Sequence, residues 1–592
     1  MRQRTPIFSV LLSTHVRGEE ARDPIHRLHP PRTQLAPHAS LSPFHIFPLF
    51  SFLLLPLRPM GTAPLCRLIR PLLLCGLAVQ AHLLSTCSAR PAHTLRAQPA
   101  SASGRRLTAR ISRTATAAEV LSLHAKAGTS FNAIHLATCW AVLARVSKDR
   151  ERLIWHADSA QLASLRNQTV ARLPSLDSRS IASTAHALAK LGLCGPEWDV
   201  LWDPLREAAL SHVKGFAAQG LAMTAYAFAK RGQPAADLFG AIAKEAITRI
   251  DEFKPQELAN VAWSFATLRF EAPELFDALS AIAIVQLPQF KSQELTSTAW
   301  SFATAGHPSP AFFDAIAVVS IPVLREYSAQ SLANLAWSCA KLGHTSPDLL
   351  HSISLAAVIR LGEFKPQELS NLAWALAKAE YDGVHFFEQL DYACRVRLSD
   401  FKAQELASTA WAFSRRRIPA HKLYAALAVV AARRASEFKP QEIAKMAWAY
   451  ANAGHSAAAL FDRLAMVAAP RLHEFKPQGI ALTAWAFSKA NHSAPALFDA
   501  IAAESLSRLS EFDAQALSNL AWAFATSKHP APELFSALAA EAAPRLAQGK
   551  FKPRELAALA WAFSRFDDSR IELFDAMGVA AGMMQLDKIS KL

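Results

Sequence analysis

The chain has 592 residues, of which 51% are hydrophobic and 19% charged, and this composition excludes a wholly disordered, collagen-like or low-complexity protein. Its seven cysteines include no CxxC pair, which excludes a disulfide framework and the common zinc sites. The formal net charge of +15 favours an acidic partner such as nucleic acid only if the charge lies on the folded part of the chain.

The positive charge is concentrated at the N-terminus. Residues 1–118 contain 15 arginines, no lysine and three acidic residues, so they carry +12, and the remaining 474 residues carry only +3. The segment is rich in Arg, Ser, Ala and Pro, which is typical of an organelle transit peptide. Its two apolar runs, 44–57 and 71–84, are shorter than the roughly 20 residues that span a bilayer.

The order of these features predicts a disordered targeting presequence over residues 1–116, with a signal-like part followed by a transit-like part. The apolar run 71–84 precedes the small residues Ser88 and Ala89, and an Arg-rich stretch without acids follows. We therefore expect the mature chain in an organelle matrix, either of a mitochondrion or of a plastid, without stable membrane insertion. A start of translation at Met60 is a second interpretation of this region.

An internal repeat occupies the rest of the chain, and its most regular element is the string PQELANVAWSFA at 255–266. The tryptophan of this string returns at positions 263, 300, 337, 374, 411, 448, 485, 522 and 561, with a spacing of 37 residues seven times and then of 39. Tyr226, His186 and Trp140 take its place in three weaker upstream copies. Twelve units at this regularity predict a repeat array.

Each unit is predicted to form two helices. Pro255 suits a first helical turn, and from Leu258 to Phe265 apolar residues follow at i, i+3, i+4 and i+7. Pro273 then opens a second helix with its own apolar stripe, which includes Phe276. One hairpin cannot bury its apolar stripe alone, whereas stacked neighbours can.

The predicted fold class is therefore all-α, an α-solenoid of about 12 helix-hairpin repeats of 37 residues. We expect the helical repeat domain over residues 117–585, with a short tail at 586–592. No alternating strand pattern of useful length occurs in 119–592.

The repeated tryptophan is predicted to pack against the neighbouring repeat, because flanking alanines leave room for a large ring. On this interpretation its replacement would cost about 3–5 kcal/mol through a cavity. Base stacking by the tryptophans is the alternative. The aromatic residue ten positions earlier, such as Phe253, is likewise predicted to lie in the core or to act as a hydrophobic staple.

The first helix of each unit also carries a polar stripe. In the Trp263 unit the stripe is Gln256, Asn260, Ser264 and Thr267, spaced four, four and three residues. Stacked repeats would turn it into a ladder with one rung per repeat, in which amides and hydroxyls can bond base edges and Lys or Arg can hold phosphates. The alternative is a merely solvated helix surface. The candidate RNA-binding residues are Gln256, Asn260, Gln293, Ser297, Gln330, Asn334, Lys341, Gln367, Asn371, Lys378, Gln404, Ser408, Arg415, Gln441, Lys445, Lys489 and Asn519.

A lysine such as Lys254 recurs just before the first helix, and stacked copies would form a basic rail for phosphates. Acidic residues such as Glu252 and Glu257 recur on both sides, so a neutralised surface is an equal alternative. Histidines such as His307 recur in the loop between the two helices. We expect turn or capping roles for them, with RNA contact as the alternative, because one histidine per repeat is too widely spaced for a metal site.

No phosphate-binding GxxxxGK[ST], HExxH, GxSxG or kinase signature occurs in the sequence. We therefore expect no enzyme activity, no cofactor, no metal site and no small-molecule substrate.

The strings LANVAWSFA, LANLAWSCA, LSNLAWALA and LSNLAWAFA resemble organellar RNA-binding helical repeats. The unit is similar to heptatricopeptide and octotricopeptide repeats, to the leucine-rich region of FAST-kinase-like proteins and to the helical-repeat accessory proteins of trypanosome mitochondrial RNA editing. The resemblance covers roughly 130–580. It implies binding of organellar transcripts that governs their processing, stability or translation, often in ribonucleoprotein granules. Many such proteins end in a RAP domain, which is not recognisable in the short segment after Trp561.

The sequence thus predicts an organellar protein that binds single-stranded RNA selectively and acts by occupying a transcript, with other RNA-processing proteins as further partners. The alternative is a non-catalytic protein–protein interaction scaffold of armadillo-like type, which the nearly neutral repeat region favours.

Overall fold

The structure, a computed structural model, describes residues 102–147, 160–233, 235–344, 346–565 and 571–589. The predicted leader falls largely on residues 1–101, which lie outside the described residues, so it stays a prediction. Within the described ranges every regular element is a helix, and neighbouring helices pack in a regular repeat. The predicted all-α solenoid is confirmed.

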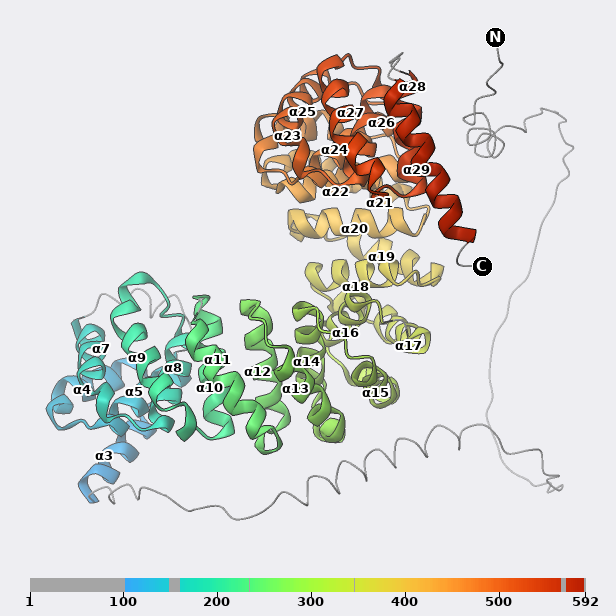
Figure 1. The fold of residues 1–592 in the computed structure, drawn as a ribbon. Helices are drawn as coiled ribbons and strands as arrows, with labels where there is room; N and C mark the ends of the chain where they lie inside the picture. Colours follow the sequence, from blue (N-terminus) through green and yellow to red (C-terminus); the bar gives the residue numbers. More distant parts are fainter. Residues whose placement is uncertain (1–101, 148–159, 234, 345, 566–570, 590–592) are drawn as a thin grey trace, which may run out of the picture. The chain divides into compact units, whose positions relative to one another are not determined.

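In the part of the chain that the structure describes, twelve hairpins follow one another, each made of a first and a second helix (Figure 1). The first helices are α5 (Ala133–Val146), α8 (Ser178–Leu191), α10 (Ala218–Arg231), α12 (Pro255–Leu268), α14 (Ser292–Ala305), α16 (Ala329–Leu342), α18 (Pro366–Lys378), α20 (Ala403–Arg415), α22 (Pro440–Ala453), α24 (Pro477–Lys489), α26 (Ala514–Ser527) and α28 (Pro553–Arg565). The second helices are α7 (Ala160–Arg172), α9 (Asp199–Ser211), α11 (Ala236–Thr248), α13 (Pro273–Gln286), α15 (Pro310–Ser320), α17 (Pro347–Val358), α19 (Val384–Arg395), α21 (His421–Arg433), α23 (Ala458–Ala468), α25 (Pro495–Arg508), α27 (Pro532–Ala547) and α29 (Ile571–Ile589).

Two helices, α3 (Ala102–Arg113) and α4 (Ala117–Ala127), precede the first hairpin. Although α3 lies inside the segment predicted as a leader, it packs against α5. A ring nitrogen of His135 lies 3.0 Å from the Gly104 carbonyl oxygen, and the Arg145 guanidinium donates to the Ser112 carbonyl oxygen at 2.6 Å. The packed helices thus begin before residue 117, and at the other end α29 covers part of the predicted tail.

Local sequence signals explain where the first helices begin and which side they bury. In α18, Pro366 occupies the first helical position, and the Lys365 N–H donates to the Glu368 carboxylate at 2.8 Å. Leu369 and Leu372 are fully buried on the core side. The same bond from the residue before the helix to a glutamate three residues later recurs in α12, α14, α20, α22 and α28, so these glutamates act as caps.

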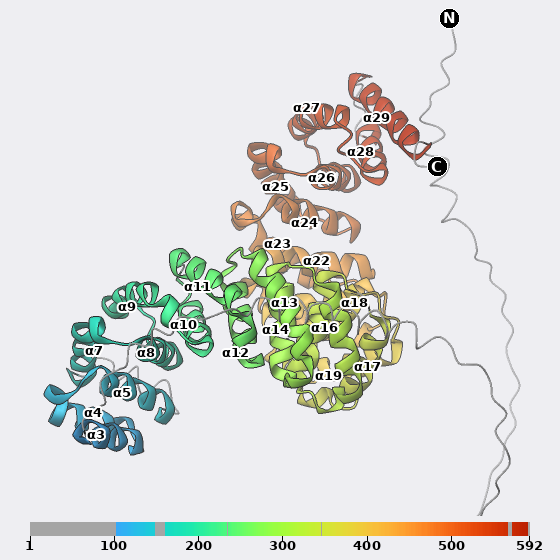
Figure 2. The same ribbon diagram turned by 60° about the horizontal axis from the view of Figure 1, so that its bottom comes forward.

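Successive first helices pack directly against one another, and each second helix packs on its own first helix and on its neighbours (Figure 2). Small buried residues such as Ala336 and Ala373 allow the first helices to approach closely. One continuous core runs through the described residues from Ile111 to Ala580. Because each repeat contacts mainly the next, stability is expected to be a sum of repeat and nearest-neighbour terms.

In seven repeats of the described residues, an arginine at or just after the end of the second helix ties that end to the start of the same hairpin, a feature that the sequence reasoning missed. Its guanidinium donates to the carbonyl oxygen of the aromatic residue that precedes the first helix of the same hairpin. The N–O distances are 2.7–3.1 Å for Arg249, Arg360, Arg397, Arg434, Arg471 and Arg508, with Phe216, Tyr327, Phe364, Phe401, Phe438 and Phe475 as acceptors. Arg545 makes the same bond to Phe512, and Gln286 replaces the arginine opposite Phe253. The recurrence of arginine at a 37-residue spacing was the signal in the sequence.

Most of these arginines also bind a glutamate three residues later, which predicts a sensitivity to acid. The hydrogen bond from the arginine holds the pKa of Glu363, Glu437, Glu474 and Glu511 below its usual value of 4.5. A depressed pKa contributes stability above the unfolded-state value, and this contribution is lost as the pH falls through the folded-state value. We expect the urea midpoint to decrease as the pH falls below about 4.5.

The matched control is the fourfold glutamate-to-glutamine variant at these positions. It keeps the arginine bonds to the carbonyl oxygens but removes the four titrating groups, so its midpoint should fall less steeply over the same pH range. Identical slopes for the two proteins would contradict the assignment of this effect to the Arg–Glu pairs.

The recurring histidines join neighbouring repeats, consistent with a structural role. The rings of His307, His344, His492 and His529 lie 2.8–3.3 Å from the carboxylates of Asp277, Asp314, Asp462 and Asp499 on the second helix of the preceding repeat. The equivalent His455 stacks instead on the Tyr424 ring, with centroids 5.3 Å apart.

Candidate nucleic-acid interface

The predicted polar stripe lies at the surface of the first helices. Its glutamines, near the N-terminal end of each helix, are exposed: Gln256, Gln293, Gln330, Gln367, Gln404 and Gln441. The next rung is half-buried: Asn260, Ser297, Asn334, Asn371, Ser408, Lys445 and Asn519. The basic rungs near the C-terminal end are exposed: Lys341, Lys378, Arg415 and Lys489. Each set repeats on successive first helices, so the rungs form parallel rows.

One position of the predicted stripe is wrong. Ser264 is fully buried, and its hydroxyl donates to the Asn260 carbonyl oxygen in the helix. The residue that takes its place at the surface is Trp263, which is half-buried. The stripe therefore runs through Gln256, Asn260, Trp263 and Thr267, at intervals of four, three and four residues that keep to one side of a helix. The sequence alone could have predicted this assignment, since the spacing can be read from it directly.

The nine tryptophans from Trp263 to Trp561, here called the tryptophan row, lie between the amide rungs and the basic rungs. Rings of adjacent repeats contact one another from Trp300 to Trp448 and from Trp485 to Trp561, with centroids 6.1–6.4 Å apart and planes inclined by 27–37°. Tyr226 extends the series before Trp263 at 5.2 Å. At this separation the rings are offset rather than face to face. Packing between repeats is thus confirmed, and the half-buried state leaves part of each ring at the surface.

The weak upstream copy at Trp140 does not belong to this row. Trp140 is fully buried, its indole N–H donates to the Thr169 hydroxyl at 3.0 Å, and its ring meets Trp198 edge to face. In α5 the position equivalent to Trp263 is the exposed Ala141, one residue later. The position equivalent to Trp263 was therefore predicted one residue too early in this unit.

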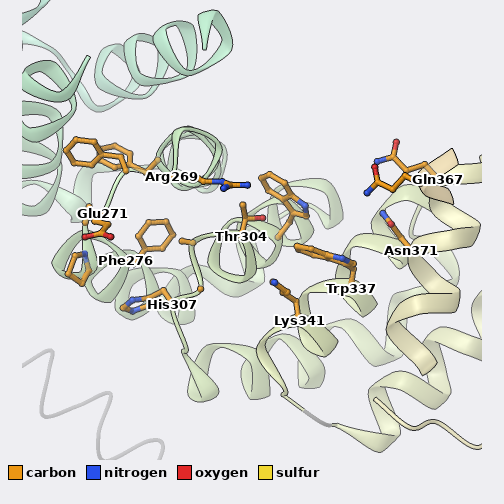
Figure 3. A pocket seen from close by; sticks show the side chains of 17 residues that line it. Arg269, Glu271, Phe276, Thr304, His307, Trp337, Lys341, Gln367 and Asn371 are labelled. Atoms are coloured by element: carbon orange, nitrogen blue, oxygen red, sulfur yellow. The ribbon is translucent and has the colours of Figure 1, made fainter. Parts of the chain in front are cut away.

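A cavity of about 920 Å³ opens on the stripe between α12 and α20. Trp300 and Trp337 line it together with the cations Arg269 and Lys341. Its polar lining includes Thr304, Gln367, Asn371 and Gln404. Figure 3 shows Trp337 and Lys341 next to each other, with Asn371 beside Gln367 on one side of them and Thr304 and Arg269 on the other. The cavity brings rungs from several repeats to one place.

Two of the predicted basic rungs are less available to a phosphate than the others. Burial lowers the pKa of Lys445, whose ammonium lies 3.4 Å from the hydroxyl of Ser408, the equivalent rung of the repeat before. Arg415 pairs with Glu380 at 3.0 Å. Lys341, Lys378 and Lys489 are therefore the strongest candidates for phosphate contact among the predicted basic rungs.

The predicted lysine rail is exposed at Lys254, Lys291, Lys365, Lys402, Lys439, Lys476 and Lys552. The neighbouring glutamates bind the backbone N–H of most of these lysines, so they are fixed close to the rail. The rail is therefore a mixed-charge border of the stripe rather than a purely basic one.

The described ranges contain no group of three or more His, Cys, Asp or Glu side chains arranged to hold a metal ion. In the same part of the chain, no helix combines the length and the apolar character needed to cross a bilayer.

These features define a class: an α-solenoid of helical hairpins whose first helices present repeated aromatic, amide and basic side chains on one surface. The model of the RNA-editing substrate-binding complex 6 protein family matches residues 232–358 and 352–584, which is more than half of the chain, and the chain belongs to this family. The match begins just after α10 and thus covers the most regular repeats. No curated protein matches the sequence at a significant level.

Proposed function

We propose that this chain is a non-catalytic subunit of an RNA-editing substrate-binding complex in mitochondria, where it holds single-stranded RNA along its first helices. The observation that carries the proposal is the coincidence of the tryptophan row with amide rungs on one side and basic rungs on the other. The family's name supports the process and the complex. The transit-like composition of the N-terminal segment supports the location.

Each kind of side chain would serve a different part of the nucleic acid. Exposed parts of the tryptophan rings offer stacking surfaces to bases, and stacking tolerates any sequence. The half-buried Asn and Ser rungs, which vary between repeats, can read base edges and would supply selectivity. Lys341, Lys378 and Lys489 would hold phosphates. In this role the chain shields a transcript or presents it to other subunits.

The test is the salt dependence of binding of the full chain to a single-stranded RNA of about 25 nucleotides. Each phosphate contact to a single strand contributes about 0.7 to the slope of log K against log salt. Replacing Lys341, Lys378, Arg415 and Lys489 with glutamine should reduce the magnitude of that slope by about 3 if all four contact phosphates, and by less if the pairing of Arg415 persists.

The matched control replaces four exposed basic residues of other surfaces with glutamine: Lys214, Lys244, Lys422 and Arg433. This variant carries the same net charge as the first, and both keep the arginines of the N-terminal segment. Its slope should therefore remain close to that of the natural chain. Equal slopes for the two variants, or a natural chain that fails to bind RNA at low salt, would refute the proposal.

A further inference from the structure

A row of large apolar side chains is exposed on the second helices, away from the tryptophan row. Its members occupy the same position in five successive repeats, at a spacing of 37 residues, and are 50–73% exposed. They are Val318, Leu355, Tyr392, Val429 and Met466, on α15, α17, α19, α21 and α23. The equivalent position holds alanine in the repeats that flank this range, at Ala281, Ala503 and Ala540, and Lys244 and Val579 in α11 and α29 further out. The row thus has defined ends.

The row is widest at its centre. One turn further along the chain, Ile359 and Val396 are also exposed, so α17 and α19 each present two large apolar residues. The core does not need these side chains, because α17 buries a separate set that includes Leu349, Leu350 and Ile353. Soluble proteins rarely expose contiguous apolar surface of this kind without a binding function.

Charge borders the row on one side. One turn before the apolar position, three of the five helices expose a carboxylate: Asp314, Glu388 and Asp462. Asp314 and Asp462 contact histidine rings but remain 72% and 65% exposed. On the other side, Arg433 of α21 takes the position that Val396 has in α19. The acidic border favours an occupant with a basic edge.

The spacing of the row fits a helix laid across the repeats. Packed helices lie about 8–10 Å apart, and seven residues of an α-helix rise about 10.5 Å. Apolar residues at every seventh position of a partner helix would therefore meet successive second helices.

We propose that the apolar row of α15–α23 docks an amphipathic helix of a protein partner, with apolar residues at a seven-residue spacing and lysine or arginine along one edge. This surface shares no residue with the stripe on the first helices. Binding of a protein partner to this surface can therefore be tested independently of RNA binding.

The probe is a fluorescent 28-residue synthetic helix with leucine at the apolar heptad positions, lysine along one edge and alanine or glutamine elsewhere. Its counterpart has glutamate in place of each lysine. We expect the lysine peptide to bind the full chain at micromolar concentration and at least about tenfold more tightly than the glutamate peptide. In the double variant Leu355→Ser and Tyr392→Ser, affinity for the lysine peptide should fall at least about tenfold.

The matched control is the double variant Ile134→Ser and Val200→Ser, which removes exposed apolar residues from α5 and α9 and should bind normally. Melting curves of both variants check that they are folded. Absence of binding, equal affinity for the two peptides, or an undiminished affinity of the Leu355→Ser and Tyr392→Ser variant would overturn the proposal. So would sedimentation that finds a dimer of the natural chain and a monomer of that variant, because a second copy would then cover the row.

Discussion

Replacing both Trp300 and Trp337 with leucine should weaken binding of single-stranded RNA by at least about tenfold, whereas phenylalanine at both positions should retain most of the affinity. The two rings line the cavity of the stripe and offer part of their surface to solvent. Stacking of a base on an aromatic side chain contributes about 1–3 kcal/mol, and 1.4 kcal/mol corresponds to a tenfold change in affinity. The measurement is fluorescence anisotropy with a labelled RNA at fixed salt.

The comparison of leucine with phenylalanine separates base stacking from packing between repeats. Both substitutions remove the indole, but only phenylalanine keeps an aromatic ring on which a base can stack. The salt slope should stay the same in both variants, since neither changes a charge. This distinguishes the tryptophans from the basic rungs. If the leucine and phenylalanine variants bound RNA equally, the tryptophan row would only pack neighbouring repeats together and would not stack on bases.

The second large effect is a loss of stability, expected when a fully buried core residue of a first helix is replaced. Phe413→Ala in α20 should cost about 3–5 kcal/mol of unfolding free energy, because the ring is fully buried and packs on Phe387 with centroids 5.5 Å apart. Trp411→Ala, two residues earlier, should cost clearly less although the side chain is larger. The Trp411 ring is half-buried, so its removal leaves an open notch rather than a closed cavity.

Hydrogen exchange resolved to α20 and its neighbours is the suitable measurement, since a repeat array need not unfold in two states. Ser436→Ala, an exposed substitution nearby, serves as the control. A cost for Trp411→Ala equal to that of Phe413→Ala would show that the tryptophans are core residues. Because the tryptophan rings are half-buried, we now expect a cost below the roughly 3–5 kcal/mol of a closed cavity.

Much of the fold follows from local sequence. The 37-residue period, the proline at the first helical position and the glutamate cap predict the hairpins and most of their starts, because helix capping depends only on residues within one turn. The site is less predictable. The sequence placed the glutamines and the basic rungs at the surface correctly but put Ser264 there in place of Trp263, because an apolar ring is expected in a core.

The sequence by itself determined the number of repeats, their division into two helices and the residue types that recur. Only the tertiary structure decided which side of each helix meets a neighbour, because burial depends on how closely whole helices pack. Small residues such as Ala373 let the first helices approach until the tryptophans pack between repeats with their edges at the surface. The same packing brings each arginine to a carbonyl oxygen about 33 residues away and leaves Leu355 and Tyr392 uncovered. No local pattern contains these distances, because they arise between residues far apart in the sequence.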